Sequence, residues 1–137
     1  MAALLLENLL GLLEGQPGPI WVGEVPYEIA VRLGLKNHNV YLTQNTLTHI
    51  LDRHPDIEGY TLLLIPIILG RGLWVQERAK PNMVIASYYS PITEKRHMAV
   101  MKITANNSEV WLASFYRAHA RQTVSLLKKG IILRAHK

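Results

Sequence analysis

The chain has no cysteine among its 137 residues. This absence excludes disulfide scaffolds, zinc sites built on thiolates and cysteine nucleophiles. The chain also lacks an HExxH segment, an EF-hand loop and a triad of carboxylates, so we expect no metal ion and no other cofactor. A P-loop, a GxGxxG fingerprint and a G-x-S-x-G elbow around Ser114 are missing as well, so a hydrolase triad is not expected.

A stretch suited to cross a membrane or to direct secretion is also missing. The apolar run LLLIPIIL at 62–69 is too short to span a bilayer. The N-terminal MAALLLENLLGLLEG has no positively charged start, and Glu7 interrupts it, so it does not have the pattern of a signal peptide. We expect a protein that does not associate with membranes and that acts in the cytoplasm, its own or that of a target cell into which it is delivered.

The N-terminal leucines recur at helical spacing and predict an amphipathic helix that stops at Gly15 and Pro17. The residues that carry this spacing are Leu5, Leu9, Leu12 and Leu13. A helix that lies on a membrane surface would carry lysines on its polar face, and this one carries Glu7 and Glu14 instead. We therefore expect it to pack on its own domain or on a second copy of the chain in a homodimer.

Basic residues are concentrated in the C-terminal part of the chain, which has a net charge of +5. Residues 1–59 hold seven acidic and three basic side chains, whereas residues 95–137 hold nine basic side chains and one acidic, Glu109. This asymmetry predicts that the C-terminal part meets a polyanion, most simply nucleic acid. The alternative is a basic surface that binds nothing, or one that neutralises the acidic half.

The order of the periodic segments predicts an α+β fold in a single domain, residues 1–137. We expect residues 1–38 to form a helical N-terminal extension and residues 39–137 to form the core. Within that core, the helices come first, and a roughly four-stranded antiparallel meander follows from Leu73 onward. A short helix around 119–129 and a last strand, IILRA, complete the predicted order.

The segment TQNTLTHILDRHPDI at 43–57 is the clearest helix and carries two histidines. Thr43 suits the N-cap, and Pro55 disfavours helical geometry at His54, so the helix should end there. The predicted buried stripe is Leu47, Ile50, Leu51 and His54. His49 and Arg53, four residues apart, share another face. The two histidines are five residues apart and diverge, which argues against a shared metal ion. For His54, helix capping and packing are as good an explanation of its presence as a role in a functional site.

The last hairpin predicts which residues share a face of the sheet. A two-residue turn at Asn106–Asn107 is plausible because asparagine tolerates positive φ. The resulting register gives the pairs His97–Tyr116, Ala99–Ser114 and Met101–Leu112. If PITE closes the preceding hairpin, Tyr88 lies beside His97, so one face carries Tyr88, His97 and Tyr116 in a row. A slip of one residue would move these side chains to opposite faces. Alternatively, they are only the solvent side of a half-buried sheet.

Imidazole, hydroxyl and guanidinium groups can carry out metal-free RNA cleavage. A general base takes the proton of the ribose 2′-OH, this oxygen attacks the adjacent phosphate, and a general acid protonates the leaving oxygen. Histidine suits both roles because its pKa lies near neutrality, while arginine and lysine stabilise the phosphate. The candidate catalytic residues are His49, Arg53, His54, His97, Ser114 and Tyr116, and the candidate RNA-binding residues are Lys95, Arg96, Lys102, Arg117 and Lys128.

The succession VYLTQNTLTHILDRHPDI, then VWLASFYRAH and LLKKGIILRA, resembles the barnase–EndoU–colicin–RelE superfamily of metal-independent ribonucleases, in its phage and polymorphic-toxin branch. The resemblance covers about residues 39–135 and rests on the histidine helix, the basic central strands and the late S-F-Y-R. It implies an RNase toxin or RNA-processing nuclease with helices followed by a roughly four-stranded antiparallel sheet. By this resemblance His49 matches the helix histidine and Ser114 the late hydroxyl, whereas His97 depends on the predicted register.

We therefore expect a metal-independent RNA endonuclease that acts as a toxin on tRNA or mRNA and leaves 2′,3′-cyclic phosphate ends. Its expected partners are RNA and an antitoxin or immunity protein, together with a second copy bound through the leucine-rich helix. Two alternatives remain open: a non-catalytic nucleic-acid-binding module, and a phage or mobile-element interaction protein. Salt-sensitive binding without cleavage would indicate the nucleic-acid-binding module. The absence of both cleavage and binding would leave the interaction protein.

Overall fold

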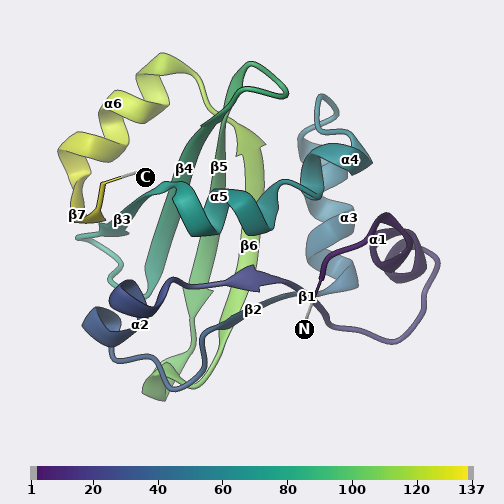
Figure 1. The fold of residues 1–137 in the computed structure, drawn as a ribbon, viewed down its shortest axis with the longest axis horizontal. Helices are drawn as coiled ribbons and strands as arrows, with labels where there is room; N and C mark the ends of the chain where they lie inside the picture. The colour runs from purple at the N-terminus through teal and green to yellow at the C-terminus, as the bar shows by residue number, and fades with distance from the viewer. Residues whose placement is uncertain (1–2, 136–137) are drawn as a thin grey trace.

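The computed structural model describes residues 3–135, and a single mixed sheet forms their centre. The strand order is β1-β2-β6-β5-β4-β3-β7, and α5 crosses one face of this sheet (Figure 1). The elements are α1 Leu6–Leu13, β1 Ile20–Glu24, α2 Tyr27–Leu33, β2 Asn39–Leu42, α3 Gln44–Arg53, α4 Gly59–Leu62, α5 Ile65–Arg71, β3 Leu73–Glu77, β4 Met83–Ser90, β5 Lys95–Ile103, η1 Ala105–Asn107, β6 Val110–Arg117, α6 Ala120–Lys129 and β7 Gly130–Arg134.

The α+β class is confirmed, but the prediction of a four-stranded antiparallel sheet is wrong. The meander β3-β4-β5-β6 is present and antiparallel, and it forms the centre of a seven-stranded sheet. The strand β2 joins it by pairing parallel to β6, β1 pairs antiparallel with β2, and β7 pairs antiparallel with β3. These added pairings join segments far apart in the chain, so no local turn signals them. Residues 1–38 thus contribute the strand β1 as well as helices.

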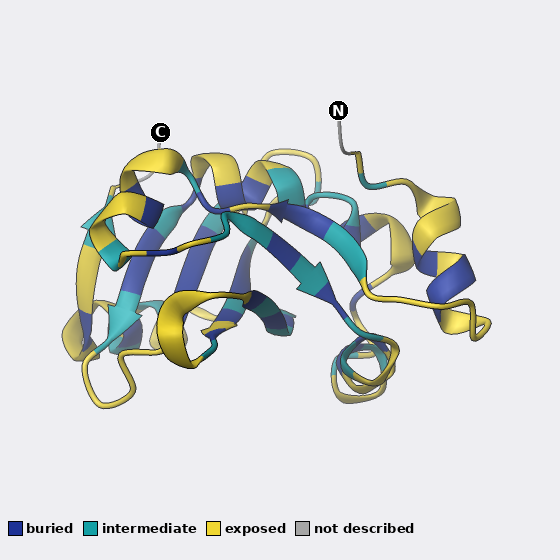
Figure 2. Ribbon diagram, turned by 90° about the horizontal axis from the view of Figure 1, so that it is seen from below, coloured by how far each residue is buried: buried dark blue, intermediate teal, exposed yellow. Residues whose placement is uncertain are grey.

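The sheet has two faces that bury different sets of side chains. The front face, which carries Ala99, Met101 and Phe115, packs against α1 to α5 in the larger core. The back face carries Met98 and Val100 and packs in part against α6. Buried residues accordingly run along the strands in Figure 2, while the outer surfaces of the helices are exposed. The strict alternation of side chains along a strand assigns each residue to one face.

Two local features explain where α4 ends and α5 begins and how α5 packs on the front face of the sheet. In α5 the proline Pro66 lies in the first turn, where its missing N–H is no loss, so the apolar segment divides into α4 and α5 instead of forming one helix. The fully buried Trp74 of β3 donates its indole N–H to the Leu69 carbonyl at 2.9 Å. This bond and the burial of the indole hold α5 against the sheet.

Helix α3 forms and ends where the sequence predicts. The Thr43 hydroxyl oxygen accepts a hydrogen bond from the Thr46 N–H at 3.2 Å, and the last helical residue is Arg53. Of the predicted stripe, Leu47 and Ile50 are buried, while Leu51 and His54 are half-buried. The backbone leaves helical geometry at His54, just before Pro55, so this imidazole stands at the end of the helix.

The predicted register of β5 and β6 is correct on one side of a bulge in β6 and shifted by one residue on the other side. Met101 does lie opposite Leu112, and Tyr88 lies opposite His97 in the preceding hairpin. Between Val100 and Met101 the register shifts, and Ala113 has no partner on β5. Beyond this bulge the partners are His97–Arg117, Met98–Tyr116, Ala99–Phe115 and Val100–Ser114. One extra residue reverses the alternation, so Tyr116 and Ser114 face the back and His97 faces the front. The predicted row of Tyr88, His97 and Tyr116 does not exist.

The β5–β6 connection confirms the role of its asparagines in a longer turn than predicted. Asn106 and Asn107 both have positive φ, at 71° and 56°. The turn is closed by the Thr104 N–H, which donates to the Glu109 carbonyl at 3.0 Å. Asparagine is tolerated here because its short polar side chain lowers the cost of the left-handed region.

Candidate functional site

The end of α3 meets the end of β6 through two aromatic rings. The imidazole of His54 stacks on the phenol ring of Tyr116, with ring centroids 5.5 Å apart and planes tilted by 29°. Both side chains are half-buried. His54 is held there by the helix end on one side and Pro55 on the other, so the imidazole reaches the back face at a fixed place.

The hydroxyl of Tyr116 has a weak partner and remains protonated. It donates to the Met98 sulfur at 3.4 Å, and a thioether is a poor acceptor. Burial raises the pKa of Tyr116, and the negative charge of Glu77 raises it further. At neutral pH this phenol is therefore a donor that a stronger acceptor, such as a phosphate oxygen, would draw away from the sulfur.

Other polar and aromatic side chains extend this surface along the back face. Ser114 precedes Tyr116 by two residues, shares its face and is half-buried. Farther along β6, Trp111 lies opposite Lys102, and its ring is 6.2 Å from that of Tyr41 on β2. Proteins bind single-stranded nucleic acids with arrangements of this kind. The basic side chain contacts the nucleic-acid backbone, and the aromatic rings stack on the bases.

Arg96 is fixed on the same face by a neighbouring strand. It pairs with Tyr89 across β4 and β5, and its guanidinium donates to the Ser87 hydroxyl at 3.0 Å. Arg96 is half-buried and makes no ion pair within the part of the chain that the structure describes. Its remaining donors suit an oxyanion.

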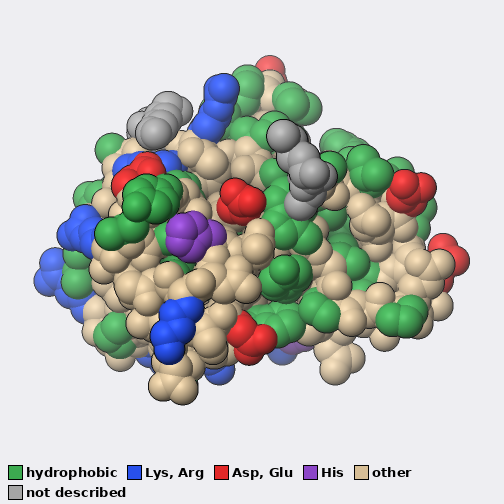
Figure 3. Space-filling model, turned by 60° about the horizontal axis from the view of Figure 1, so that its bottom comes forward, with side chains coloured by type: hydrophobic (Ala, Val, Ile, Leu, Met, Phe, Trp, Pro, Cys, Tyr) green, Lys and Arg blue, Asp and Glu red, His purple; other side chains and the backbone are tan. Residues whose placement is uncertain are grey.

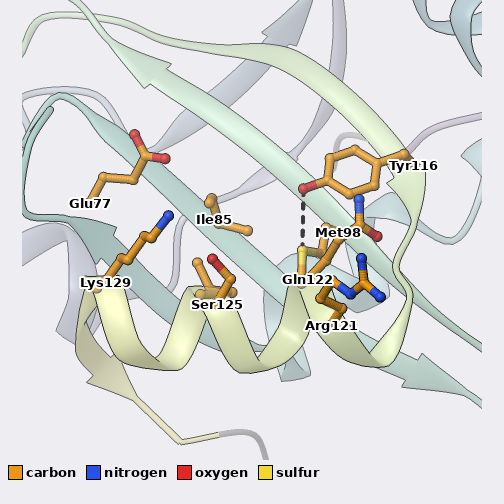
Figure 4. A pocket seen from close by; sticks show the side chains of 10 residues that line it. Glu77, Ile85, Met98, Tyr116, Arg121, Gln122, Ser125 and Lys129 are labelled. Atoms are coloured by element: carbon orange, nitrogen blue, oxygen red, sulfur yellow. Dashed lines mark hydrogen bonds between the residues drawn. The ribbon is translucent and has the colours of Figure 1, made fainter.

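A cavity of about 420 Å³ lies between α6 and the back face. Its walls are Tyr116, Met98, Ile85 and Glu77 from the sheet and Arg121, Gln122, Ser125, Leu126, Lys129 and Gly130 from α6 and its end. In Figure 4, Tyr116 points toward Met98 at the end of the cavity where Arg121 lies, and Lys129 stands at the other end near Glu77. We call this the α6 cavity; its cations face the same space as the Tyr116 hydroxyl.

The α6 residues of this cavity were not among the residues predicted from sequence. Gln122, Ser125, Leu126 and Lys129 follow the i, i+3, i+4, i+7 spacing of one helix face, and this pattern could have shown which side of the helix meets the sheet. Lys128, which was predicted to bind RNA, is exposed and is not in the cavity wall. Its neighbour Lys129 lies there instead.

The remaining predicted residues are not brought together as expected. His49 and Arg53 are exposed on α3, away from the buried Leu47 and Ile50. Neither His49 nor Ser114 lines the α6 cavity. The histidine that contacts the back face, through its stack on Tyr116, is His54.

His97 lies in the front layer and is almost fully buried, with 2% of its surface exposed. Its Nε2 atom is 2.8 Å from the Thr93 hydroxyl oxygen, and its ring stacks on Phe115 at 5.6 Å. Burial lowers the pKa of His97, the charges of Lys95 and Arg117 lower it further, and only Asp56 opposes them. His97 is thus separated by the sheet from Ser114 and Tyr116, with Lys95 and Arg117 on its side.

Charge is distributed unevenly over the surface. On the face shown in Figure 3, lysines and arginines lie toward the end opposite α1 with acidic side chains among them, whereas the α1 end shows aspartate or glutamate and apolar side chains. Within residues 3–135, no group of histidine and carboxylate side chains is arranged to hold a metal ion. Over the same residues, none of the helices combines the length and the hydropathy needed to cross a bilayer.

Comparison with known proteins adds no further constraint. No family model matches the chain, and no curated protein and no solved structure matches it either.

Proposed function

We propose that this chain is a metal-independent RNA endonuclease, and that its catalytic surface is the back-face cluster of His54, Tyr116 and Ser114. The observation that carries the proposal is the stack of His54 on Tyr116, because it joins an imidazole to a protonated phenol that lines the α6 cavity. Arg121 in the cavity wall and Arg96 on the same face supply positive charge beside that pair. The resemblance to metal-independent ribonucleases supports Ser114 in this set, whereas for the helix histidine it pointed to His49 and the proposal uses His54.

The chemistry is the attack of a ribose 2′-OH on its own 3′-phosphate. The His54 imidazole in its neutral form accepts the 2′-OH proton while the new oxygen–phosphorus bond forms and the bond to the 5′-oxygen breaks. The Tyr116 hydroxyl leaves the Met98 sulfur and donates to a phosphate oxygen, and Ser114 is positioned to do the same. The guanidinium groups of Arg96 and Arg121 stabilise the charge that accumulates on the phosphate. The leaving 5′-oxygen takes its proton from water, so the products are a 2′,3′-cyclic phosphate and a free 5′-hydroxyl.

In this proposal the substrate is RNA. DNA lacks the attacking 2′-OH, so it would bind without being cleaved. The aromatic pair Tyr41 and Trp111 and the exposed Lys102 continue the surface along β2 and β6, where an unpaired strand can stack its bases. A tRNA loop or a single-stranded segment of mRNA presents such bases.

An inhibitor protein and a second copy of the chain are the protein partners in this proposal. An antitoxin or immunity protein would act by covering the back-face cluster. Four leucines of the α1 segment are between 38% and 49% exposed, which leaves an apolar surface for such a partner or for a homodimer. These exposed leucines are Leu5, Leu6, Leu10 and Leu13.

The test is to incubate purified protein with total tRNA in EDTA and to map the ends of any fragments. We expect 2′,3′-cyclic phosphate ends, and we expect His54→Ala to abolish them while His49→Ala, on the exposed side of the same helix, retains them. Cleavage that survives His54→Ala but is lost in His49→Ala would overturn the assignment of the site. Salt-sensitive binding of intact RNA with no cleavage would show that the chain is a nucleic-acid-binding module and not an enzyme.

A further inference from the structure

A second, smaller pocket lies at the end of the sheet, on the front side. It measures about 190 Å³ and lies between the β4–β5 turn and the segment that joins α3 to α4. Both of these segments are at the upper end of the molecule in Figure 1. We call it the hairpin pocket. Pockets that enclose a drug-sized ligand measure roughly 300–1,000 Å³, so this pocket can enclose only part of a nucleotide, while the rest of that ligand lies along its exposed walls.

The two walls of the hairpin pocket carry opposite charges. Lys95 at the start of β5 and Arg117 at the end of β6 are the cations, and both are exposed. Asp56 and Glu58 on the α3–α4 segment are the anions, and they are exposed as well. No salt bridge within residues 3–135 joins these cations to these carboxylates. A ligand with an anionic part and a hydrogen-donating part would satisfy both walls.

His97 lines the hairpin pocket and is almost fully buried. The Nδ1 atom of His97 is buried and has no hydrogen-bond partner among the residues that the structure describes. The other ring nitrogen is occupied by Thr93, which also lines the pocket. A buried ring nitrogen without a partner costs stability.

We infer that the hairpin pocket is a nucleotide subsite that takes a phosphate on Lys95 and Arg117 and the amino group of a base on Asp56 and Glu58. The exposed ring of Tyr60 lines the same pocket and is available for stacking on that base. Carboxylates accept hydrogen bonds from exocyclic amino groups of bases, which selects cytosine, adenine or guanine over uracil.

The hairpin pocket and the back-face cluster are built from the same two segments. Arg117 directly follows Tyr116 on β6, and Asp56 follows His54 by two residues on the α3 side. The two sites lie on opposite sides of the strand end, so an RNA strand that passes around this end can reach both. This inference rests on the proposed function only in that the nucleotide belongs to a bound RNA; binding to the pocket itself needs no cleavage.

Two mononucleotides of equal size give the sharpest test. Cytidine and uridine 5′-monophosphate differ at ring position 4, where cytosine has an amino group and uracil a carbonyl. Binding is followed by the imidazole nitrogen resonances of His97 in the intact chain. We expect the cytidine nucleotide to bind about tenfold more tightly than the uridine nucleotide, because the carbonyl would face a carboxylate. Inorganic phosphate should shift the same resonances only at higher concentration.

Matched variants test which side chains bind the base and which bind the phosphate. The double variant Asp56→Asn and Glu58→Gln should remove the preference for cytidine, and Lys95→Gln with Arg117→Gln should weaken both nucleotides and inorganic phosphate. These side chains are exposed, so the fold should tolerate their exchange. As a control, Arg121→Gln with Lys129→Gln removes the cations of the α6 cavity and should leave the His97 response unchanged.

Failure of the subsite and failure of the nuclease give different results. A protein that cleaves tRNA, but whose His97 resonances respond equally to both nucleotides or to neither, overturns the subsite alone. A cytidine preference that persists in the Asp56→Asn and Glu58→Gln variant also overturns it. Selective binding of the cytidine nucleotide by a protein that cleaves no RNA supports the subsite and contradicts the proposed nuclease.

Discussion

His54 and Tyr116, which lie on different elements and are 62 positions apart in the sequence, stack their rings 5.5 Å apart at the end of the sheet. The pairing has two local causes and one tertiary cause. Pro55 ends the helix at His54, and Tyr116, next to the last residue of the strand β6, lies beside this helix end. The bulge at Ala113 then turns the tyrosine toward the back face instead of the front.

The hydroxyl and the ring of Tyr116 should contribute separately to RNA cleavage. Tyr116→Phe keeps the ring that supports His54 and removes the donor, so we expect single-turnover cleavage to slow by about tenfold to a hundredfold while RNA affinity stays the same. Tyr116→Ala removes the support as well and should slow cleavage further. Equal rates for the wild type and Tyr116→Phe would show that the hydroxyl takes no part.

The cations of the α6 cavity should govern the salt dependence of RNA binding. Arg121→Gln and Lys129→Gln, made singly, should each weaken binding and reduce the slope of log affinity against log salt by roughly 0.7 for a single strand. Lys80→Gln, which exchanges an exposed cation on the β3–β4 connection, is the matched control and should leave the slope unchanged. Filter binding at several salt concentrations measures these slopes, and identical slopes for all variants would exclude the cavity from the RNA interface.

His97 should make folding less favourable in mild acid. Its pKa is lowered in the folded state by burial and by Lys95, so the unfolded chain binds the proton first as the pH falls. The stabilisation is complete above the unfolded pKa of about 6.5 and is lost as the pH falls from there through the folded pKa. Urea denaturation at pH 7.5 and at pH 5 should show this loss. It should be smaller in His97→Asn than in the wild type, while His49→Asn, at an exposed site, should behave like the wild type.

The bulge itself is open to a direct test. Deleting Ala113 removes the extra residue and leaves the other partners in place, so Ser114 stays on the back face opposite Val100 and Phe115 stays in the front core opposite Ala99. We therefore expect the deletion variant to fold. If β5 and β6 were paired without a bulge, the same deletion would move Phe115 out of the core and cost about 3–5 kcal/mol. Urea denaturation measures the difference, with Ala113→Ser, which keeps the bulge, as the control. A loss of that size in the deletion variant would contradict the assigned pairing.

Much of the local structure was predictable from the sequence. The cap and the end of α3 depend on Thr43 and Pro55, which act on their own neighbours, so no tertiary information was needed. The β4–β5 pairing of Tyr88 with His97 was also predictable, since the short PITE turn fixes the register. The half-buried position of His54 followed from its place in the apolar stripe.

The candidate site was only partly predictable. The sequence pointed to His54, Ser114, Tyr116 and Arg96, and these do share the back face or border it. It also placed His97 beside Tyr116, which is wrong, because a bulge in the middle of a strand leaves no signal of its own in the residue pattern. Arg121 and Lys129 were missed because their importance depends on where α6 packs, and this depends on the apolar surface of the sheet.

By itself the sequence determined the α+β class, the limits of α3, the chemistry available to the chain and the concentration of positive charge in its C-terminal part. All of these depend on the residue types present or on interactions between close neighbours. Only the tertiary structure decided that the sheet has seven strands, that His54 and not His49 meets Tyr116, and that His97 is buried on the front side of the sheet, away from Tyr116. These outcomes depend on strand pairing and helix packing between distant segments, where one inserted residue exchanges the two faces of a strand.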